Sequence, residues 1–235
     1  MSGSLKTTGE KSVSLSKKDI VIYVLMVITA VLITAAGIYY KQKFLLFMPL
    51  YVSLIIARLQ SKVNRYASLL GSINSLVYGV VYFIFNLYGS ALSAIFFSAP
   101  IQALTFIRWN KNKSGESTVL RKLTWRQRII MVVGYVLLLV ALWIILPLLG
   151  SEYVFLDSAT TLLGILIYFL TMFAYIEYPV LMIVNGIINI ALYVTMLKDS
   201  PDIITHLIFA VYSFVCTVFA AFEAKKLYEN QQKSK

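Results

Sequence analysis

The stretch 129-IIMVVGYVLLLVALWIILPLL-149 is rich in Leu, Val and Ile and has no charged side chain. The hydrocarbon core of a bilayer is about 30 Å thick, and a helix needs roughly 20 apolar residues to cross it. The stretch is therefore long enough to span a membrane as one helix. Because it is also nearly free of polar groups, it fits the role of a connector between two halves of a membrane protein.

The rest of the chain has the same apolar character. Of its 235 residues, 60% are hydrophobic and only 13% are charged, and the mean hydropathy is +0.81. A soluble domain of this size does not need so many apolar residues for its core, so we expect a protein that crosses the membrane several times. The short run that ends near Arg58 is the least secure span. The eight expected spans are 20–40, 44–60, 66–86, 89–109, 129–149, 153–173, 177–197 and 202–224.

The distribution of basic residues orients these spans. The formal net charge is +11, and with eight spans all but three of the 21 Lys and Arg residues fall on one side of the membrane. Basic residues accumulate on the cytoplasmic side, so both termini are expected in the cytoplasm. Basic loops beside lipid account for the charge, and nucleic acid is not expected as a partner. The three exceptions are Lys41, Lys43 and Lys198.

An internal repeat relates the two halves of the chain. A shift of 111 residues aligns spans two to four with spans six to eight without a gap. Three helices per repeat would leave the halves oppositely oriented, but a connector helix between them makes the repeats parallel, which is a known plan of transporters. The shift places Asn74 on Asn185, Tyr78 on Asn189, Tyr82 on Tyr193 and Gln102 on Ser213.

The predicted fold is an all-α integral membrane protein of about eight transmembrane helices, in which a linker helix joins two parallel three-helix repeats and one extra helix precedes them. The loop 110–128 is expected to be a basic connector, with an amphipathic segment from Ser117 onward along the cytoplasmic surface. The predicted segments are a cytoplasmic tail (1–19), the extra N-terminal helix (20–40), the first repeat (44–109), the loop (110–128), the linker helix (129–149), the second repeat (153–224) and a second cytoplasmic tail (225–235).

Polar side chains at bilayer depth indicate where a ligand binds. An amide in hydrocarbon is costly unless it is hydrogen-bonded, and one common explanation is that such amides bridge helices. Here amides and tyrosines recur with i, i+4, i+8 spacing in both repeats, which favours a site for a neutral, flat, hydroxylated ligand. The candidate substrate-binding residues on these two stripes are Asn74, Tyr78, Tyr82, Asn185, Asn189 and Tyr193.

The fourth span carries a further polar stripe. Ser98, Gln102, Thr105 and Trp109 recur at i, i+4, i+7 and i+11, so they share one face of the helix and join the candidate substrate-binding residues. Trp109 is equally well explained as an aromatic residue at the membrane interface. Pro100 lies in the same span and is expected to bend it, because its ring leaves a carbonyl about one turn earlier without a partner.

Few other residues could supply chemistry. Asp157 and Glu177 lie near span ends, where a solvated or helix-capping acid is the commoner case, and His206 is expected to be a solvated end residue rather than a proton relay. We therefore see no strong sign of ion coupling. With one His in the chain, no glycine-rich phosphate loop and no histidine pair for a metal, we expect no enzyme, no catalytic residues, no cofactor and no metal site.

Two segments carry a family resemblance. The segment 71-GSINSLVYGVVYFIFNLYGSALSAIFFSAPIQALTFIRW-109 contains a G-x-x-N motif, a following Gly, and an amide seven residues ahead of a Trp. The segment 155-FLDSATTLLGILIYFLTMFAYIEY-178 begins with Phe-x-Asp-Ser and has an acid before the next helix. Together they resemble the PnuC family of bacterial vitamin-precursor transporters, also described as the nicotinamide riboside or nicotinamide mononucleotide transporter family.

The resemblance covers about residues 44 to 228 and implies a SWEET-like fold in a bacterial plasma membrane. It also implies facilitated diffusion of a small-molecule substrate, nicotinamide riboside, which a cytoplasmic kinase then phosphorylates and traps. A homo-oligomer is compatible with the sequence. The positions that match the family's site are Asn74, Gln102, Asn185 and Asn189.

One departure leaves the ligand open. Members associated with nicotinamide riboside commonly carry Trp-x-x-Trp shortly after the acid of the seventh span, whereas Tyr178-Pro179-Val180-Leu181-Met182 follows Glu177 here. We predict a transporter of nicotinamide riboside or a related vitamin precursor or nucleoside. A deoxynucleoside, thiamine or riboflavin is the alternative ligand, a proton-coupled symporter is the alternative mechanism, and a membrane scaffold or a membrane-embedded enzyme is the alternative class.

Overall fold

The computed structural model describes residues 17–148, 150 and 152–234. Eight of its helical segments are long and apolar enough to cross a membrane, which confirms the predicted all-α membrane fold. The short run 44–60 forms a full helix, and residues 1–16 of the predicted N-terminal tail lie outside the described part. The elements are α1 (Lys17–Tyr39), α2 (Phe44–Ser61), α3 (Tyr66–Ile84), α4 (Tyr88–Ser93), the π-helical turn η1 (Ala94–Ser98), α5 (Ala99–Lys111), β1 (Lys113–Ser114), β2 (Ser117–Thr118), α6 (Trp125–Leu148), α7 (Val154–Met172), α8 (Tyr178–Met196), the 3-10 turn η2 (Pro201–Ile203) and α9 (Ile204–Lys233).

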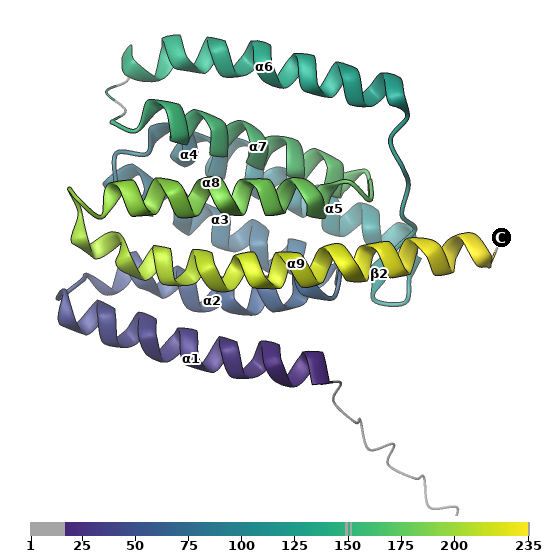
Figure 1. Cartoon of the computed structure of the whole chain (residues 1–235), viewed down its shortest axis with the longest axis horizontal. Coiled ribbons are helices and arrows are strands. Elements are labelled where there is room, and N and C mark those ends of the chain that lie inside the picture. The colour runs from purple at the N-terminus through teal and green to yellow at the C-terminus, as the bar shows by residue number, and fades with distance from the viewer. Residues whose placement is uncertain (1–16, 149, 151, 235) are drawn as a thin grey trace, which may run out of the picture.

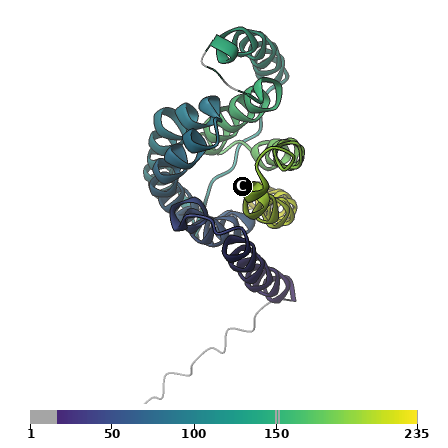
Figure 2. The ribbon, with the colours of Figure 1, turned by 90° about the vertical axis from the view of Figure 1, so that its left-hand side faces the viewer.

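Six of the helical segments form a ring, which Figure 2 views end-on. The middle helix of each predicted repeat contacts the other two, because α3 contacts α2 and α5 while α8 contacts α7 and α9. Between the repeats, α2 contacts α9 and α5 contacts α7. The first helix of either repeat thus meets the last helix of the other, a twofold pattern that is compatible with two parallel repeats.

The helices α6 and α1 lie at opposite edges of this arrangement (Figure 1). The linker helix α6 packs on α7, and of its described residues only Leu146 is buried inside the protein. Its many exposed Leu, Val and Ile side chains suit direct contact with lipid. At the other edge α1 packs on α9 and α2, and a salt bridge of 2.7 Å joins Asp19 to Lys62.

Pro100 was expected to bend the fourth span, and the structure shows an irregular helix at this point. Proline has no N–H to donate, and the helix adjusts by one π-helical turn immediately before it, in which the Ala99 N–H bonds to the Ala94 carbonyl. The wider turn brings Ile95 against Gly79 of α3, where a Cβ would lie 2.4 Å from the Ile95 Cγ1. A glycine is therefore needed at position 79 for α3 and this turn to pack.

The loop after α5 differs from the expectation. Instead of an amphipathic segment along the membrane surface, it forms the β1–β2 hairpin and then an extended strap, residues 119–124, that docks on the turn between α7 and α8. The Arg121 N–H donates to the Ala174 carbonyl, and the Ile176 N–H donates to the Arg121 carbonyl, both at 2.8 Å. These backbone pairs replace the internal bonds of a helix, and they bury Leu120 and Leu123.

The last helix continues past its predicted span. The predicted tail 225–235 continues α9 as a helix to Lys233, and it extends well beyond the other helices (Figure 1). Gln231 near its end holds the hairpin and strap, because its Nε2 donates to the Thr118 carbonyl at 3.0 Å and its Oε1 accepts from the Leu120 N–H at 2.9 Å. The end of the ring with this extension, the hairpin and the start of α1 is called the basic end below.

Candidate functional site

The ring encloses two adjoining cavities that share much of their lining. The first, the basic-end chamber, has a volume of about 250 Å³ and reaches Asn64, Trp109 and Tyr178. The second, the opposite-end chamber, has a volume of about 210 Å³ and reaches Leu87, Ser90 and His206. The helices α2, α3, α5, α7, α8 and α9 all contribute to the first chamber, so the site lies between the two predicted repeats.

All ten candidate residues line these chambers. Whether they bind a ligand stays a prediction, but the structure brings them together around one space from three spans, those that contain α3, α5 and α8. Lining both chambers are Tyr82, Gln102, Asn185, Asn189 and Tyr193; lining the basic-end chamber only are Thr105 and Trp109; lining the opposite-end chamber only are Asn74, Tyr78 and Ser98.

Asn74 bridges two helices. Its Nδ2 donates to the Pro49 carbonyl at 3.1 Å and to the Ser53 Oγ at 2.8 Å, both on α2. Only 5% of the residue is exposed. Its amide hydrogens therefore hold α3 against α2, which is a helix-bridging role.

Gln102 is positioned by a glycine. Its Nε2 donates to the Ser75 Oγ at 2.9 Å, and its Oε1 lies against the backbone of Gly71, where a Cβ would approach this oxygen to 1.9 Å. No side chain larger than hydrogen fits at position 71 while Gln102 keeps this rotamer. The close approach of α3 to α5 thus fixes where the amide of Gln102 points into the cavity.

The Gly71→Ala variant is expected to weaken ligand binding about three- to tenfold, although Gln102 itself is unchanged, because the added methyl displaces its amide. Calorimetry on the purified protein measures the effect. Gly134→Ala on α6 is the matched control, since no atom lies within 4 Å of the added Cβ. Equal affinities of the two variants would show that the position of the Gln102 amide does not matter.

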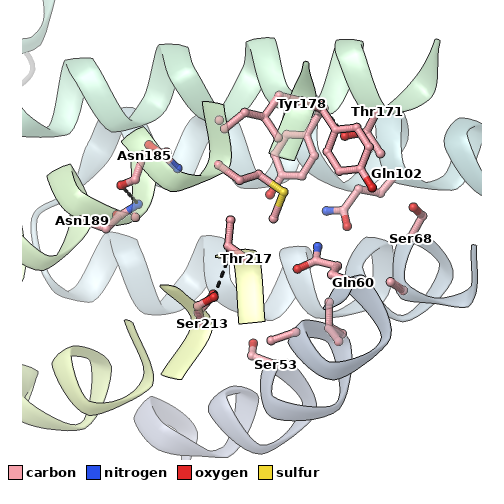
Figure 3. A pocket seen from close by; sticks show the side chains of 18 of the residues that line it. Ser53, Gln60, Ser68, Gln102, Thr171, Tyr178, Asn185, Asn189, Ser213 and Thr217 are labelled. Atoms are coloured by element: carbon pink, nitrogen blue, oxygen red, sulfur yellow. Dashed lines mark hydrogen bonds between the residues drawn. The ribbon is translucent and has the colours of Figure 1, made fainter. Parts of the chain in front are cut away.

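The side-chain amides of α8 make fewer hydrogen bonds to other helices than Asn74 does. The Asn189 Nδ2 donates to the Asn185 carbonyl at 3.0 Å, as drawn in Figure 3. The Asn185 Oδ1 is buried and has no hydrogen-bond partner within the described chain. A buried acceptor without a donor costs free energy, so Asn185 is the amide best prepared to accept a hydrogen bond from a ligand.

Tyrosines line the wall next to these amides. The rings of Tyr78 and Tyr82 are stacked, with centroids 5.3 Å apart and planes at 27°. The Ser53 Oγ donates to the Tyr78 hydroxyl at 3.0 Å, which fixes the first ring. Tyr193 and Tyr168 complete this wall from the second repeat. The arrangement offers aromatic surface to a flat or cationic ring.

The polar stripe of the fourth span faces inward as predicted. Thr105 bonds to the carbonyl of Ile101 in its own helix at 2.7 Å. Trp109 is only 2% exposed, and its Nε1 donates to the Thr171 carbonyl at 2.7 Å across the junction of α5 and α7. Trp109 is thus a buried interhelical residue, and the interpretation as a lipid-facing interfacial Trp is wrong.

Asp157 is a helix-capping acid as expected, whereas His206 differs from the expectation. Asp157 is fully buried, and it caps a different helix from its own, because its carboxylate accepts from the Gly89 and Ser90 N–H groups at 3.1 and 3.2 Å. Glu177 pairs with Arg128 at 2.7 Å at the basic end. His206 was expected at a solvated helix end but is 1% exposed.

Sequence reasoning missed the lining contributed by α2 and α7. The 111-residue repeat also relates lining residues of α2 to lining residues of α7, so the sequence contained the signal. The residues related by this repeat are Ser53 and Gly164, Ala57 and Tyr168, and Gln60 and Thr171.

A metal site would need a group of three or more His, Cys, Asp or Glu side chains, and no such group occurs among the described residues.

Comparisons with known proteins identify the family of this chain and a solved structure with the same fold. A family model described as nicotinamide mononucleotide transporter matches residues 43–223. The comparison with curated proteins gave no match. Among solved structures, the crystal structure of the vitamin B3 transporter PnuC aligns with a TM-score of 0.78 and 21% identity, over 92% of this chain and 94% of that chain, which shows a common fold. The family model spans most of the chain, and we conclude that the protein belongs to the nicotinamide mononucleotide transporter family and is a multi-pass membrane transporter rather than an enzyme.

Proposed function

We propose that the protein takes up nicotinamide riboside, the nucleoside form of vitamin B3, by facilitated diffusion. The proposed binding residues are those that line the two chambers, with Asn185 and Gln102 as the principal hydrogen-bonding amides. The family is described by a nucleotide and the similar structure by a vitamin. The lining of the cavity supports an unphosphorylated ligand.

The observation that carries the proposal is the lack of charge in the cavity. None of the residues that line the two chambers in the described part of the chain is Lys, Arg, Asp or Glu. A phosphate group carries close to two negative charges at pH 7 and is normally bound by Arg, Lys or a helix N-terminus. Moving it into this cavity would remove its hydration without replacing it, so an unphosphorylated nucleoside fits better.

The rest of the ligand matches the lining. A carboxamide has a carbonyl and an NH2 group, and both pair well with amides such as Gln102 and Asn185. The pyridinium ring of nicotinamide riboside is flat and carries a delocalised positive charge, which the faces of tyrosine rings attract without a carboxylate. Tyr78 and Tyr82 supply such a surface. The cavity thus offers aromatic surface from α3, although the Trp-x-x-Trp pair is missing from α8.

We further propose that a cytoplasmic kinase traps the ligand after entry and that both termini face the cytoplasm of a bacterial plasma membrane. The acid-free cavity supports transport without ion coupling, since no carboxylate lines it in the described residues. The positive-inside pattern of the loops supports the orientation. A homo-oligomer is compatible with the exposed apolar face of α6.

Nicotinamide riboside and nicotinamide mononucleotide differ only in the phosphate, whose charge no described lining residue neutralises. Nicotinamide riboside is therefore expected to bind at least tenfold more tightly, which corresponds to about 1.4 kcal/mol. Calorimetry on the purified protein with both compounds measures the difference. Thiamine, riboflavin and a deoxynucleoside belong in the same panel as the alternative ligands. Equal affinity for the mononucleotide would contradict the proposal, and tighter binding of another compound would replace the ligand.

Proton coupling is tested separately. Transport into liposomes is expected to be insensitive to an imposed pH gradient, because the cavity has no carboxylate among its described lining residues. Uptake that accelerates when the outside is more acidic would favour the symporter alternative.

A further inference from the structure

His206 occupies an unusual position at the start of α9. It is 1% exposed and lines the opposite-end chamber. Three aromatic rings surround its imidazole, those of Phe85, Tyr193 and Tyr78, with centroid distances of 5.3, 5.9 and 6.3 Å. All three rings meet it at steep angles between 60° and 80°, so the imidazole is held in one plane.

A chain of hydrogen bonds determines which nitrogen of His206 carries the proton. Gln42, between α1 and α2, donates through its Nε2 to the Asp202 carbonyl, so its Oε1 is left to accept. The Thr205 hydroxyl lies 3.2 Å from this Oε1, 3.3 Å from the Asp202 carbonyl oxygen and 3.3 Å from the His206 Nδ1. A hydroxyl has one proton, and an amide oxygen can only accept. The Thr205 proton therefore goes to one of these two amide oxygens, and the Thr205 oxygen accepts the Nδ1–H of His206.

This assignment leaves the other ring nitrogen of His206 as an acceptor. With the proton on Nδ1, the Nε2 atom presents a lone pair. The Nε2 is buried and has no hydrogen-bond partner in the described part of the chain. An acceptor buried without a donor costs free energy, which a donor from a ligand recovers. Since the residue lines the opposite-end chamber, such a donor reaches it from the cavity.

We infer that the His206 Nε2 accepts a hydrogen bond from a sugar hydroxyl of the substrate, an inference that rests on the proposed function. Two kinds of donor occur on nicotinamide riboside, the ribose hydroxyls and the carboxamide NH2. The amides that suit a carboxamide are Gln102 and Asn185, which line both chambers, whereas His206 lines only the opposite-end chamber. The ribose hydroxyls are therefore the donors to the His206 Nε2. Since the free base has no ribose, His206 makes the protein bind ribosides more tightly than the free base.

The His206→Phe variant tests this inference because it keeps a flat ring in the aromatic surroundings and removes the acceptor. We expect nicotinamide riboside to bind about three- to tenfold more weakly to this variant. His206→Gln is expected to keep most of the affinity, because its amide oxygen can accept in place of Nε2. Thr205→Val removes the group that orients the imidazole, and it is expected to weaken binding less than His206→Phe. Calorimetry gives the affinities, and thermal unfolding in detergent shows that each variant is folded.

A riboside without the carboxamide, pyridine riboside, distinguishes the two donors. If the sugar is the partner, His206→Phe weakens the binding of both ribosides by the same factor. An effect on nicotinamide riboside alone would identify the carboxamide as the donor and overturn the inference. Unchanged binding of both ribosides by His206→Phe would also overturn it, while the proposed function would stand. Wild-type protein that binds neither riboside would remove the proposed function and this inference together.

Discussion

Asn185→Ala is expected to weaken the binding of nicotinamide riboside by tenfold or more while leaving thermal stability almost unchanged. The Asn185 Oδ1 is buried in the cavity wall without a partner in the described chain, so its removal takes no hydrogen bond from the protein. A ligand donor that loses this acceptor is left unpaired, which costs about 1–3 kcal/mol, and 1.4 kcal/mol corresponds to tenfold in affinity.

Asn74→Ala is the matched comparison, since it removes the equivalent amide of the other repeat. Its Nδ2 bonds to Pro49 and Ser53, so we expect a loss of unfolding free energy of about 1–3 kcal/mol and a smaller effect on affinity. Calorimetry and thermal unfolding in detergent measure both quantities for both variants. If Asn74→Ala lost affinity and Asn185→Ala lost stability, the division of roles between the two amides would be wrong.

Asp157→Ala is expected to lower the free energy of unfolding by about 3 kcal/mol or more, because each buried donor left unpaired costs about 1–3 kcal/mol. The Asp157 carboxylate accepts from the Gly89 N–H at 3.1 Å, the Ser90 N–H at 3.2 Å and the Ser90 Oγ at 2.5 Å. These donors belong to the first turn of α4, where a negative charge also stabilises the exposed N–H groups of the helix. The residue therefore fastens the last helix of the first repeat to the first helix of the second.

Asp199→Ala is the control for this variant, because Asp199 is exposed at the same end of the ring, and in the described chain only the Tyr153 hydroxyl bonds to its carboxylate. Little change is expected there. Unfolding monitored by circular dichroism in detergent, with gel filtration to detect aggregation, compares the two. A stable Asp157→Ala protein would mean that the two N–H groups find another acceptor.

The eight spans could be predicted from composition because a membrane segment has a simple requirement, a long run of apolar residues. The irregular parts could not be predicted in the same way. The π-helical turn before Pro100 depends on how α3 packs at Gly79, and the strap depends on backbone bonds to the turn at Ala174. Both are tertiary effects that a local pattern does not contain. The helical extension to Lys233 was missed because its polar residues resemble those of a tail, whereas Gln231 holds it on the hairpin.

The inward-facing residues of the candidate site could be predicted because polar groups avoid lipid, and the repeat placed them at equivalent positions. Their partners could not. Asn74 and Asn185 are equivalent in the repeat, yet Asn74 is hydrogen-bonded to α2, whereas the Asn185 Oδ1 has no hydrogen-bond partner in the described chain. His206 was placed at a solvated helix end because it lies close to the boundary of its span. The neighbouring helices cover it with Tyr78, Phe85 and Tyr193, and this cover is a property of the assembled ring.

The uncharged lining of the cavity has an electrical consequence. Where a protein carries a fixed countercharge along with its substrate, part of the transported charge is cancelled, but none of the described lining residues is charged here. A pyridinium nucleoside that crosses this path would carry its own full charge through the membrane potential. One elementary charge moved across 100 mV is worth about 2.3 kcal/mol, which is roughly a fiftyfold concentration ratio. On the proposed function, the voltage of an energised cell would itself draw the vitamin inward, before any kinase acts on it.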